Sequence, residues 1–242
     1  MIVGRKVLLK EEVASTNDVA KALALEGEEE GTVVVAKTQL AGRGRMGRSW
    51  SSPLGGLYLS VVLRPDVNVG DMLLLTVLSS VPVAQAIEEL TGLEAKLKWP
   101  NDIEVDGRKV AGILVESASK SGNVEFLVLG IGINLNTDPL ELEGRNPGSL
   151  SSMTKRTYDP DASMHRALYH LDAFYERYRQ GDRDTAEYVR RSSTLGRHIT
   201  ASVGDQRVSG QAIYIDLQGA LVIKGDDGLT YRLDSVYTLH YE

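Results

Sequence analysis

The order of apolar and polar residues along the chain predicts a region of mixed strands and helices. The runs at 32–36 and 124–133 are predominantly apolar or β-branched, which is typical of buried strands. With shorter runs of the same kind, they predict seven strands, at 6–9, 32–36, 57–63, 95–99, 103–105, 110–116 and 124–133. The pair Asp106-Gly107 predicts a tight hairpin between the fifth and the sixth strand.

Three stretches place apolar residues at the spacing of a helix. They are residues 18–25, 71 to about 90, and 162–178. Ser15 or Thr16 would cap the first helix, because Ser15 and Asp18 fit a capping box loosely. Pro82 could kink the second helix. The uncharged run 72–87 is shorter than the ~20 apolar residues of a membrane span, so we expect a buried core helix there.

The pattern changes after about Ser193, where short alternating strands and tight turns take over. Five strands are expected, at 199–203, 208–217, 221–223, 229–233 and 236–241. Strands of this length and spacing favour a small β-barrel. We therefore expect two domains, an α+β domain over 1–192 and an all-β domain over 193–242.

Composition narrows the classes of function. The chain has 242 residues, no cysteine and a formal net charge of −6. The negative charge disfavours broad binding to nucleic acid or to a membrane surface. The lack of cysteine excludes disulfides, cysteine-ligated zinc and a thiol nucleophile. Because the N-terminus has no sustained apolar stretch, we expect a soluble protein of the cytoplasm.

The densest chemical signal is the segment 37–48, which carries four positive charges and no negative one. Glycine lets the backbone approach a ligand, and arginine matches phosphate or carboxylate with a planar fork of donors. Residues 42–47 also fit the dinucleotide pattern G-x-G-x-x-G, but 48–56 cannot form the helix that this pattern needs. An RNA-binding Arg/Gly segment and a solvated basic loop are the alternatives.

Two further segments could carry chemistry. In Lys98-Trp-Pro-Asn-Asp102, taken alone, a tryptophan-anchored turn is the simplest interpretation. Lys109 enters a strand directly after the expected hairpin and, taken alone, would be a solvated lysine. Its functional interpretation is a compact cation beside a developing negative charge.

Taken together, these segments resemble, in their order and their residue sequence, those of the biotin protein ligases, also called biotin–[acetyl-CoA-carboxylase] ligases. The resemblance is dense from residue 15 to about 136. It rests on Ser15-Thr16-Asn17, on Gln39 with Gly42-Arg-Gly-Arg-Met-Gly-Arg48-Ser-Trp50, on Gly56-Leu-Tyr-Leu-Ser60, on Lys98-Trp-Pro-Asn-Asp102, on Gly107-Arg-Lys109 with Ala111-Gly-Ile-Leu114, and on Gly130-Ile-Gly-Ile-Asn134.

The resemblance implies an adenylate-forming ligase that works in two steps. Biotin and ATP, with Mg²⁺, give biotinyl-5′-AMP and pyrophosphate, and biotin is then passed to a lysine of a biotin carboxyl carrier domain. The implied fold is α+β, a mixed sheet with flanking helices of the class II synthetase and biotin ligase type, followed by a small SH3-like β-barrel. No enzyme nucleophile is needed, because the mixed anhydride is itself the activated intermediate.

The resemblance also implies roles for individual residues. Lys109, Arg43 and Arg45 would be catalytic, since they can neutralise a carboxylate and a phosphate that must meet. The expected biotin-binding residues are Ser15, Thr16, Asn17, Gln39, Arg43, Gly44, Arg45 and Lys109. The expected nucleotide-binding residues are Arg45, Arg48, Trp99, Asn101, Asp102 and Asn134. Asp102 is the candidate that could help to place Mg²⁺ through water.

Other functions stay open at this point. A lipoate-type protein ligase has the nearest chemistry, and a non-catalytic biotin-binding regulatory module would use the same pocket. Some ligases of this family carry a DNA-binding domain ahead of the segment that matches Ser15-Thr16-Asn17. Because only fourteen residues precede Ser15, we expect no DNA binding. We also expect that exposed sheet edges allow a homodimer.

Overall fold

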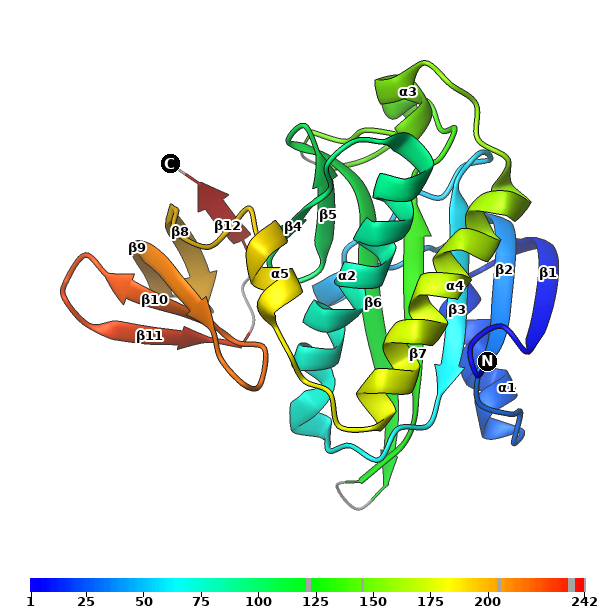
Figure 1. Ribbon diagram of the computed structural model, residues 1–242, viewed down its shortest axis with the longest axis horizontal. Coiled ribbons are helices and arrows are strands. Elements are labelled where there is room, and N and C mark those ends of the chain that lie inside the picture. The colour runs from blue at the N-terminus through cyan, green and yellow to red at the C-terminus, as the bar shows by residue number, and fades with distance from the viewer. Residues whose placement is uncertain (121–122, 145, 204–205, 235–237, 242) are drawn as a thin grey trace.

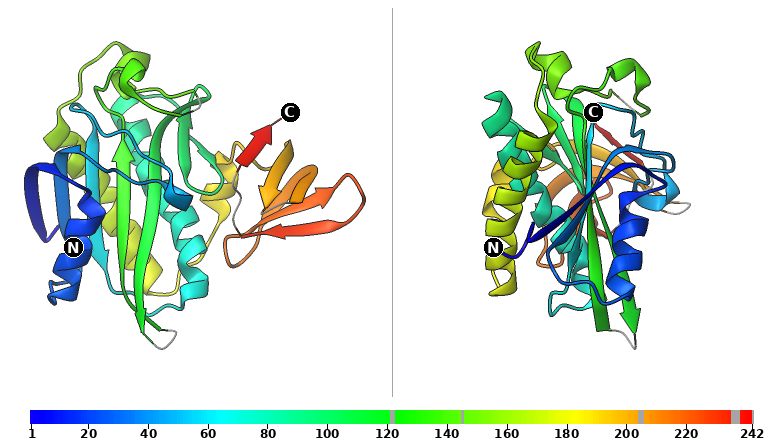
Figure 2. Two further views of the ribbon diagram at one scale, coloured as in Figure 1. Left: turned by 180° about the vertical axis from the view of Figure 1, so that it is seen from behind. Right: turned by 90° about the vertical axis from the view of Figure 1, so that its right-hand side faces the viewer.

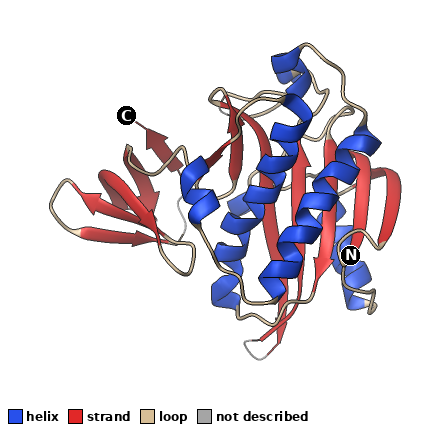
Figure 3. Ribbon diagram, viewed as in Figure 1, coloured by secondary structure: helices blue, strands red, loops and turns tan. Residues whose placement is uncertain are grey.

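The computed structural model describes residues 1–120, 123–144, 146–203, 206–234 and 238–241. The chain forms a large mixed sheet with helices on both faces and, beside it, a smaller antiparallel sheet (Figure 1). The α+β class and the mixed sheet with flanking helices are therefore confirmed. Figure 3 shows that the helices gather around the large sheet, whereas the C-terminal part is built of strands.

The large sheet has seven strands in the order β1-β2-β3-β7-β6-β5-β4. Their bounds are β1 Lys6–Val13, β2 Thr32–Gln39, β3 Leu57–Leu63, β4 Lys96–Lys98, β5 Asp102–Val105, β6 Arg108–Lys120 and β7 Asn123–Ile133. Only β1 and β2 pair in parallel, and the other neighbours are antiparallel. Asp106 and Gly107 both have positive φ, 47° and 71°, which is the hairpin geometry that this pair predicts.

The sheet is covered by helices on its two faces. The helices are α1 Thr16–Leu25, α2 Met72–Thr91, α3 Leu150–Thr154, α4 Pro160–Arg179 and α5 Ala186–Arg191, with short 3₁₀ turns at Arg45–Gly47, Val69–Asp71 and Pro139–Glu141. Figure 2 shows α2 and α4 against one face and α1 against the other. The smaller cluster beneath α1 contains Ala20, Ala24 and Val34, all buried.

Helix α2 is long and apolar enough to cross a membrane by length and composition, but two thirds of that stretch, 67%, is buried inside the protein. Leu75, Val83 and Ile87 have no exposed surface and belong to the main hydrophobic core. Burial of this kind is typical of a core helix, as the sequence predicts. The helix continues through Pro82 as one element.

Some element boundaries differ from the prediction. Strand β1 continues to Val13 rather than ending at residue 9, and α3 and α5 lie in segments with no expected helix. Ser15 is the N-cap of α1, but its side chain makes no capping hydrogen bond. Instead, Gln39 Oε1 accepts the Thr16 N–H at 2.8 Å, so a residue of β2 satisfies this helix start.

The second sheet has five strands in the order β11-β10-β9-β8-β12. They are β8 His198–Val203, β9 Gln206–Ile215, β10 Leu221–Gly225, β11 Thr230–Leu233 and β12 Thr238–Tyr241. The expected last strand began at 236, and residues 236 and 237 lie outside the described part of the chain. A division at residues 192 and 193 stays a prediction.

Trp99 connects the two sheets. Its indole Nε1 donates to the carbonyl of Gly219 at 3.0 Å, and its backbone N–H donates to Thr194 Oγ1 at 3.0 Å. Gly219 has a φ of +86°, and a Cβ there would lie 2.7 Å from the backbone of Leu74 in α2. The turn that contains Gly219 is thus packed tightly against both α2 and Trp99.

We expect Gly219→Ala to lower the free energy of unfolding by about 2–4 kcal/mol, because it adds an overpacking cost to the strain of positive φ. Gly228→Ala is the matched control, since Gly228 has a φ of +83° and no atom lies within 4 Å of the place that a Cβ would take there. It should cost only the strain, about 1 kcal/mol. Urea unfolding of both variants measures the difference, and equal losses would contradict the packing argument.

Candidate active site

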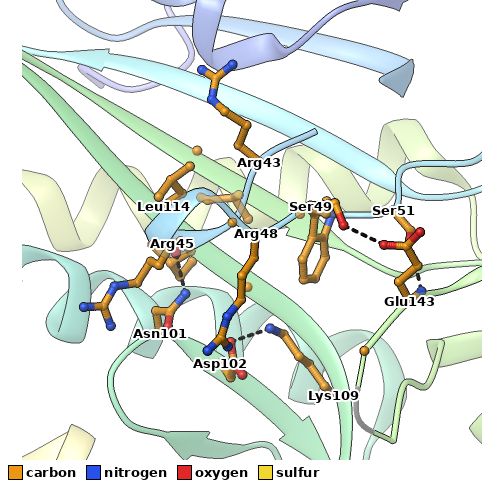
Figure 4. A pocket seen from close by; sticks show the side chains of 18 of the residues that line it. Arg43, Arg45, Arg48, Ser49, Ser51, Asn101, Asp102, Lys109, Leu114 and Glu143 are labelled. Atoms are coloured by element: carbon orange, nitrogen blue, oxygen red, sulfur yellow. Dashed lines mark hydrogen bonds and ion pairs between the residues drawn. The ribbon is translucent and has the colours of Figure 1, made fainter. Parts of the chain in front are cut away.

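A cavity of about 570 Å³ opens where the segment after β2 crosses strands β5, β6 and β7. It is lined by every residue to which the sequence analysis gave a role in binding or catalysis. Residues from distant parts of the chain meet there, and Figure 4 shows how the charged ones lie. The cavity has a neutral polar part and a charged part, which are described in turn.

The neutral part is a connected set of buried hydrogen bonds at the start of α1. Ser60 Oγ lies 2.7 Å from Thr16 Oγ1 and 2.6 Å from Asn17 Oδ1. Gln39 accepts from the Thr16 backbone and donates through Nε2 to Ser52 Oγ at 2.8 Å. Ser60 has no exposed surface, and Thr16 and Asn17 are almost fully buried. These fixed donors and acceptors suit a small, neutral, polar ring.

Glycines form the floor of the cavity. A Cβ at Gly130 would lie 2.3 Å from Asn17 Oδ1, and a Cβ at Gly132 would lie 2.4 Å from Trp50 Nε1. A Cβ at Gly112, which is paired with Gly132 across β6 and β7, would lie 3.1 Å from the same indole ring. Side chains on this face of the sheet would occupy the place of Asn17 and Trp50. The glycines therefore let both residues lie flat on the strands.

The charged part lies around Lys109. Its Nζ is 2.6 Å from Asp102 Oδ1 and 5.1 Å from the centre of the Trp50 ring. Asn101 is fixed by its Nδ2, which donates to the Ile113 carbonyl at 2.8 Å. Figure 4 places Arg48 and Asn101 beside these residues. Lys109 is thus held in position from two sides, by a carboxylate and by an aromatic ring.

Arg45 is half-buried in the cavity wall. Burial lowers the pKa of its guanidinium, while the Asp102 charge raises that pKa to a smaller extent. No hydrogen bond or ion pair joins its guanidinium to another described residue, and Figure 4 shows it pointing away from Lys109. A partly desolvated cation without a bound carboxylate is suited to an anionic ligand.

Arg43 is placed differently from the other cations of its segment. Its guanidinium binds both oxygens of Asp18 in α1, at 2.8 and 2.6 Å, and approaches Glu116 of β6 at 3.3 Å. Hydrogen bonding to Arg43 holds the pKa of Asp18 below its usual value. Figure 4 shows Arg43 directed away from Lys109 and Asp102. The structure thus brings Arg43 to the cavity edge but not to its charged part.

Two other expected ligand-binding residues use their side-chain donors within the protein. Asn134 Nδ2 donates to the Gly148 carbonyl at 2.9 Å, and the indole of Trp99 donates to Gly219. Both side chains are almost fully buried. They shape the wall of the cavity, and their backbone N–H groups are also bonded within the protein, to Thr194 and Val110. Among the described residues, Asn134 Oδ1 has no hydrogen-bond partner.

Sequence reasoning missed residues that line the cavity or that bind its lining residues. Glu116 accepts from Asn17 Nδ2 at 2.5 Å and so links the neutral part to Arg43. Glu143 accepts from Ser49 Oγ at 2.5 Å and donates through its backbone N–H to Ser51 Oγ at 3.0 Å. Spacing along the strand could not have indicated Glu116, because residues seven apart on a regular strand point to opposite faces. A register shift between β5 and β6 at Ile103 and Glu104 changes this alternation.

Asp102 was the expected contact of Mg²⁺. Among the described residues, no three His, Cys, Asp or Glu side chains are grouped so that they could hold a metal ion. Asp102 and Glu104 nevertheless both line the cavity beside its cations. This donor set fits Mg²⁺ that is carried by a phosphate ligand, because Mg²⁺ often takes one or two carboxylates and keeps much of its water.

Comparison with known proteins agrees with this arrangement. The profile of the biotin/lipoate A/B protein ligase family matches residues 9–134, and the profile of the biotin protein ligase C-terminal domain matches residues 194–235. The first match contains the whole neutral part and all the cations of the cavity. The second match contains β8 to β11, four of the strands of the second sheet, consistent with the expected SH3-like barrel.

Relatives with assigned names match over most of the chain. The bifunctional ligase/repressor BirA of Bacillus subtilis (strain 168) is 33% identical over 234 residues, which are 94% of this chain and 72% of that protein. The biotin–[acetyl-CoA-carboxylase] ligase of Paracoccus denitrificans is 34% identical over 228 residues, 88% of this chain and 92% of that protein.

A solved structure has the same overall fold. It is a biotin protein ligase from Aquifex aeolicus in complex with biotin and ATP, with a TM-score of 0.83 and 28% identity. The match covers 98% of this chain and 100% of that chain.

Proposed function

The chain belongs to the biotin/lipoate A/B protein ligase family, and on that premise we propose that it is an ATP-dependent biotin protein ligase. It forms biotinyl-5′-AMP from biotin and ATP and then transfers biotin to a lysine of an acceptor protein. The matched C-terminal profile is that of biotin protein ligases, which favours biotin over lipoate as the substrate.

One observation carries the proposal: a single cavity joins a buried neutral polar pocket to a group of cations. The neutral part, with Thr16, Asn17 and Gln39, supplies fixed donors and acceptors for the ureido ring of biotin. The cations beside it, Lys109 and Arg45, can bring the biotin carboxylate and the α-phosphate of ATP together. The reaction needs both parts in one cavity, because the two substrates must meet at the carboxylate.

Four parts of the proposal go beyond the cavity itself. The acceptor is a biotin carboxyl carrier domain, as the names of the relatives suggest. Mg²⁺ enters with ATP, where Asp102 would hold it through water and where it would screen the phosphate charges. The reaction takes place in the cytoplasm, where ATP is available. The outer edge of β1, at the end of the large sheet, offers a surface for a homodimer.

The first step is tested by exchange of labelled pyrophosphate into ATP. We expect exchange that depends on biotin, and we expect lipoate neither to support it nor to compete with biotin. Exchange that responds to lipoate instead would favour the lipoate-type ligase. Tight biotin binding without any exchange would favour a non-catalytic biotin-binding module.

Arg43→Ala should lower the adenylation rate at least ten-fold, since we propose that Arg43 leaves its carboxylate partners to bind the substrates. The matched control is Asp18→Asn, which removes the main partner of Arg43 but keeps the guanidinium. This variant should keep most of the activity. If Asp18→Asn is as defective as Arg43→Ala, the role of Arg43 is to anchor its segment on α1, and the assigned contact with substrate is wrong.

A further inference from the structure

We infer that Lys98 binds the departing pyrophosphate and that Glu104 sets how tightly it does so. The inference rests on the proposed function, since it assigns a subsite within the same cavity. The sequence assigned no role to either residue. Lys98 was only the first residue of the motif Lys98-Trp-Pro-Asn-Asp102. The inference follows from where the strand register places the two side chains.

Lys98 ends β4 and shares one face of the sheet with three other charged residues. It is paired with Asp102 of β5, and Glu104 of β5 is paired with Lys109 of β6. Asp102 and Glu104 are two residues apart, so they point to the same face, while Ile103 between them is buried in the core. All four charged residues line the cavity.

The four charges form two neighbouring ion pairs. Lys109 Nζ is 2.6 Å from Asp102 Oδ1, and Lys98 Nζ is 3.3 Å from Glu104 Oε1. The Lys98 and Glu104 side chains are 23% and 15% exposed, so both face the cavity from a partly desolvated wall. Ser193 Oγ also approaches Glu104 at 3.4 Å. Lys98 is therefore held in place two strands away from Lys109, about 10 Å by the spacing of strands.

The chemistry of adenylation favours a further cation, besides Lys109 and Arg45, at such a position. A carboxylate oxygen of biotin forms a bond to the α-phosphorus, and the bond from that phosphorus to the bridging oxygen breaks. The electron pair stays on that oxygen, which leaves with the pyrophosphate without any proton transfer. Because attacking and leaving oxygens lie roughly in line, charge grows on the side away from the carboxylate. Lys109 serves the attacking side, and Lys98 lies further along the same wall.

The Glu104 carboxylate competes with pyrophosphate for the ammonium group of Lys98. A carboxylate at 3.3 Å keeps the ammonium charged and oriented, but pyrophosphate carries more negative charge and can displace it. The same carboxylate repels the product and so favours its release. Removing Glu104 should consequently tighten pyrophosphate binding, whereas removing Lys98 should weaken it. The two variants thus have opposite expected signs.

The test compares Lys98→Ala, Glu104→Gln and a control, Lys96→Ala, in the full chain. Lys96 lies on the same strand and the same face, but it pairs with Glu94 and does not line the cavity. Two rates are measured, biotin- and ATP-dependent adenylation, and transfer to an acceptor from added biotinyl-5′-AMP. Inhibition by pyrophosphate is measured as well.

We expect Lys98→Ala to lower adenylation at least ten-fold and to weaken inhibition by pyrophosphate, with transfer from added biotinyl-5′-AMP unchanged. Lys98→Arg should restore most of the adenylation, and Glu104→Gln should strengthen the inhibition. Lys96→Ala should behave as the unmodified chain does. Normal adenylation by Lys98→Ala, an equal loss in both rates, or unaltered inhibition in Glu104→Gln would overturn the inference. An unmodified chain without biotin-dependent exchange would instead contradict the proposed function, and the inference would fall with it.

Discussion

Lys109→Ala is expected to lower the rate of biotin adenylation by about 10²–10³-fold, the usual effect of removing one preorganised donor for a developing charge. The side chain is held by Asp102 at 2.6 Å and by the Trp50 ring, so little reorganisation is needed when the phosphate charge develops. The fold should survive, because Lys109 lies on the cavity wall and not in the core. Biotin-dependent pyrophosphate exchange measures the loss, and circular dichroism checks the fold.

A second variant separates two explanations of that loss. Lys109→Ala also leaves the Asp102 carboxylate without its partner, next to the place where phosphates bind. In the double variant Lys109→Ala/Asp102→Asn this repulsion is gone. Because Asp102 is also the proposed contact of Mg²⁺, the single variant Asp102→Asn is measured beside it. We expect the double variant to stay at least 10²-fold below the unmodified chain and well below Asp102→Asn. Recovery to near-normal activity would mean that Lys109 only neutralises Asp102 and does not act on the substrates.

Arg45→Ala should separate activity from stability. Burial lowers the pKa of Arg45, which means that the folded environment disfavours its charged form relative to the unfolded chain, where the arginine is also charged. Removing the charge therefore removes a cost of folding. We expect adenylation to fall by about 10²-fold, while the free energy of unfolding stays the same or rises.

The control for this variant is Arg48→Ala, because Arg48 belongs to the same segment and is exposed. It should lower adenylation less than Arg45→Ala and leave stability unchanged. Urea unfolding and pyrophosphate exchange on the same preparations give both quantities. A clear loss of stability in Arg45→Ala would contradict the view that this cation is held for a ligand.

The fold could be predicted well where local patterns determine it. Buried strands such as β3 and the hairpin at Asp106-Gly107 follow from apolar runs and turn residues. Strand β1 was predicted too short because it is an edge strand, whose exposed half needs no apolar residues. Helix α5 was missed because it is held by tertiary contacts, among them the buried Arg191, which pairs with Glu88 of α2 at 2.9 Å.

The residues of the site also differ in how well the sequence predicts them. Motifs of glycine, arginine and lysine indicated the cavity, since these residue types have few other uses in such combinations. The carboxylates that position them were not predicted, because their partners depend on strand register. Glu104 reaches Lys98 from the neighbouring strand, and Glu116 meets Arg43 from a segment 73 residues away in sequence. Register of this kind is fixed by the folded sheet and not by local composition.

The local charge also explains why the net charge misleads. A chain of net charge −6 carries a positive segment that crosses the cavity, and acidic residues of α1 and β6 hold one of its arginines. We therefore propose that anionic substrates are recognised locally, by Arg45 and Lys109, although the protein as a whole is acidic.

The central claim is that this chain joins biotin to a protein lysine at the expense of ATP. The most direct measurement incubates it with ATP, Mg²⁺, biotin and the biotin carboxyl carrier domain of an acetyl-CoA carboxylase, and then determines the mass of the acceptor. We predict the addition of one biotinyl group, on one lysine, only when ATP and biotin are both present, and none when that lysine is replaced by arginine. An acceptor of unchanged mass after incubation with the folded chain would contradict the claim.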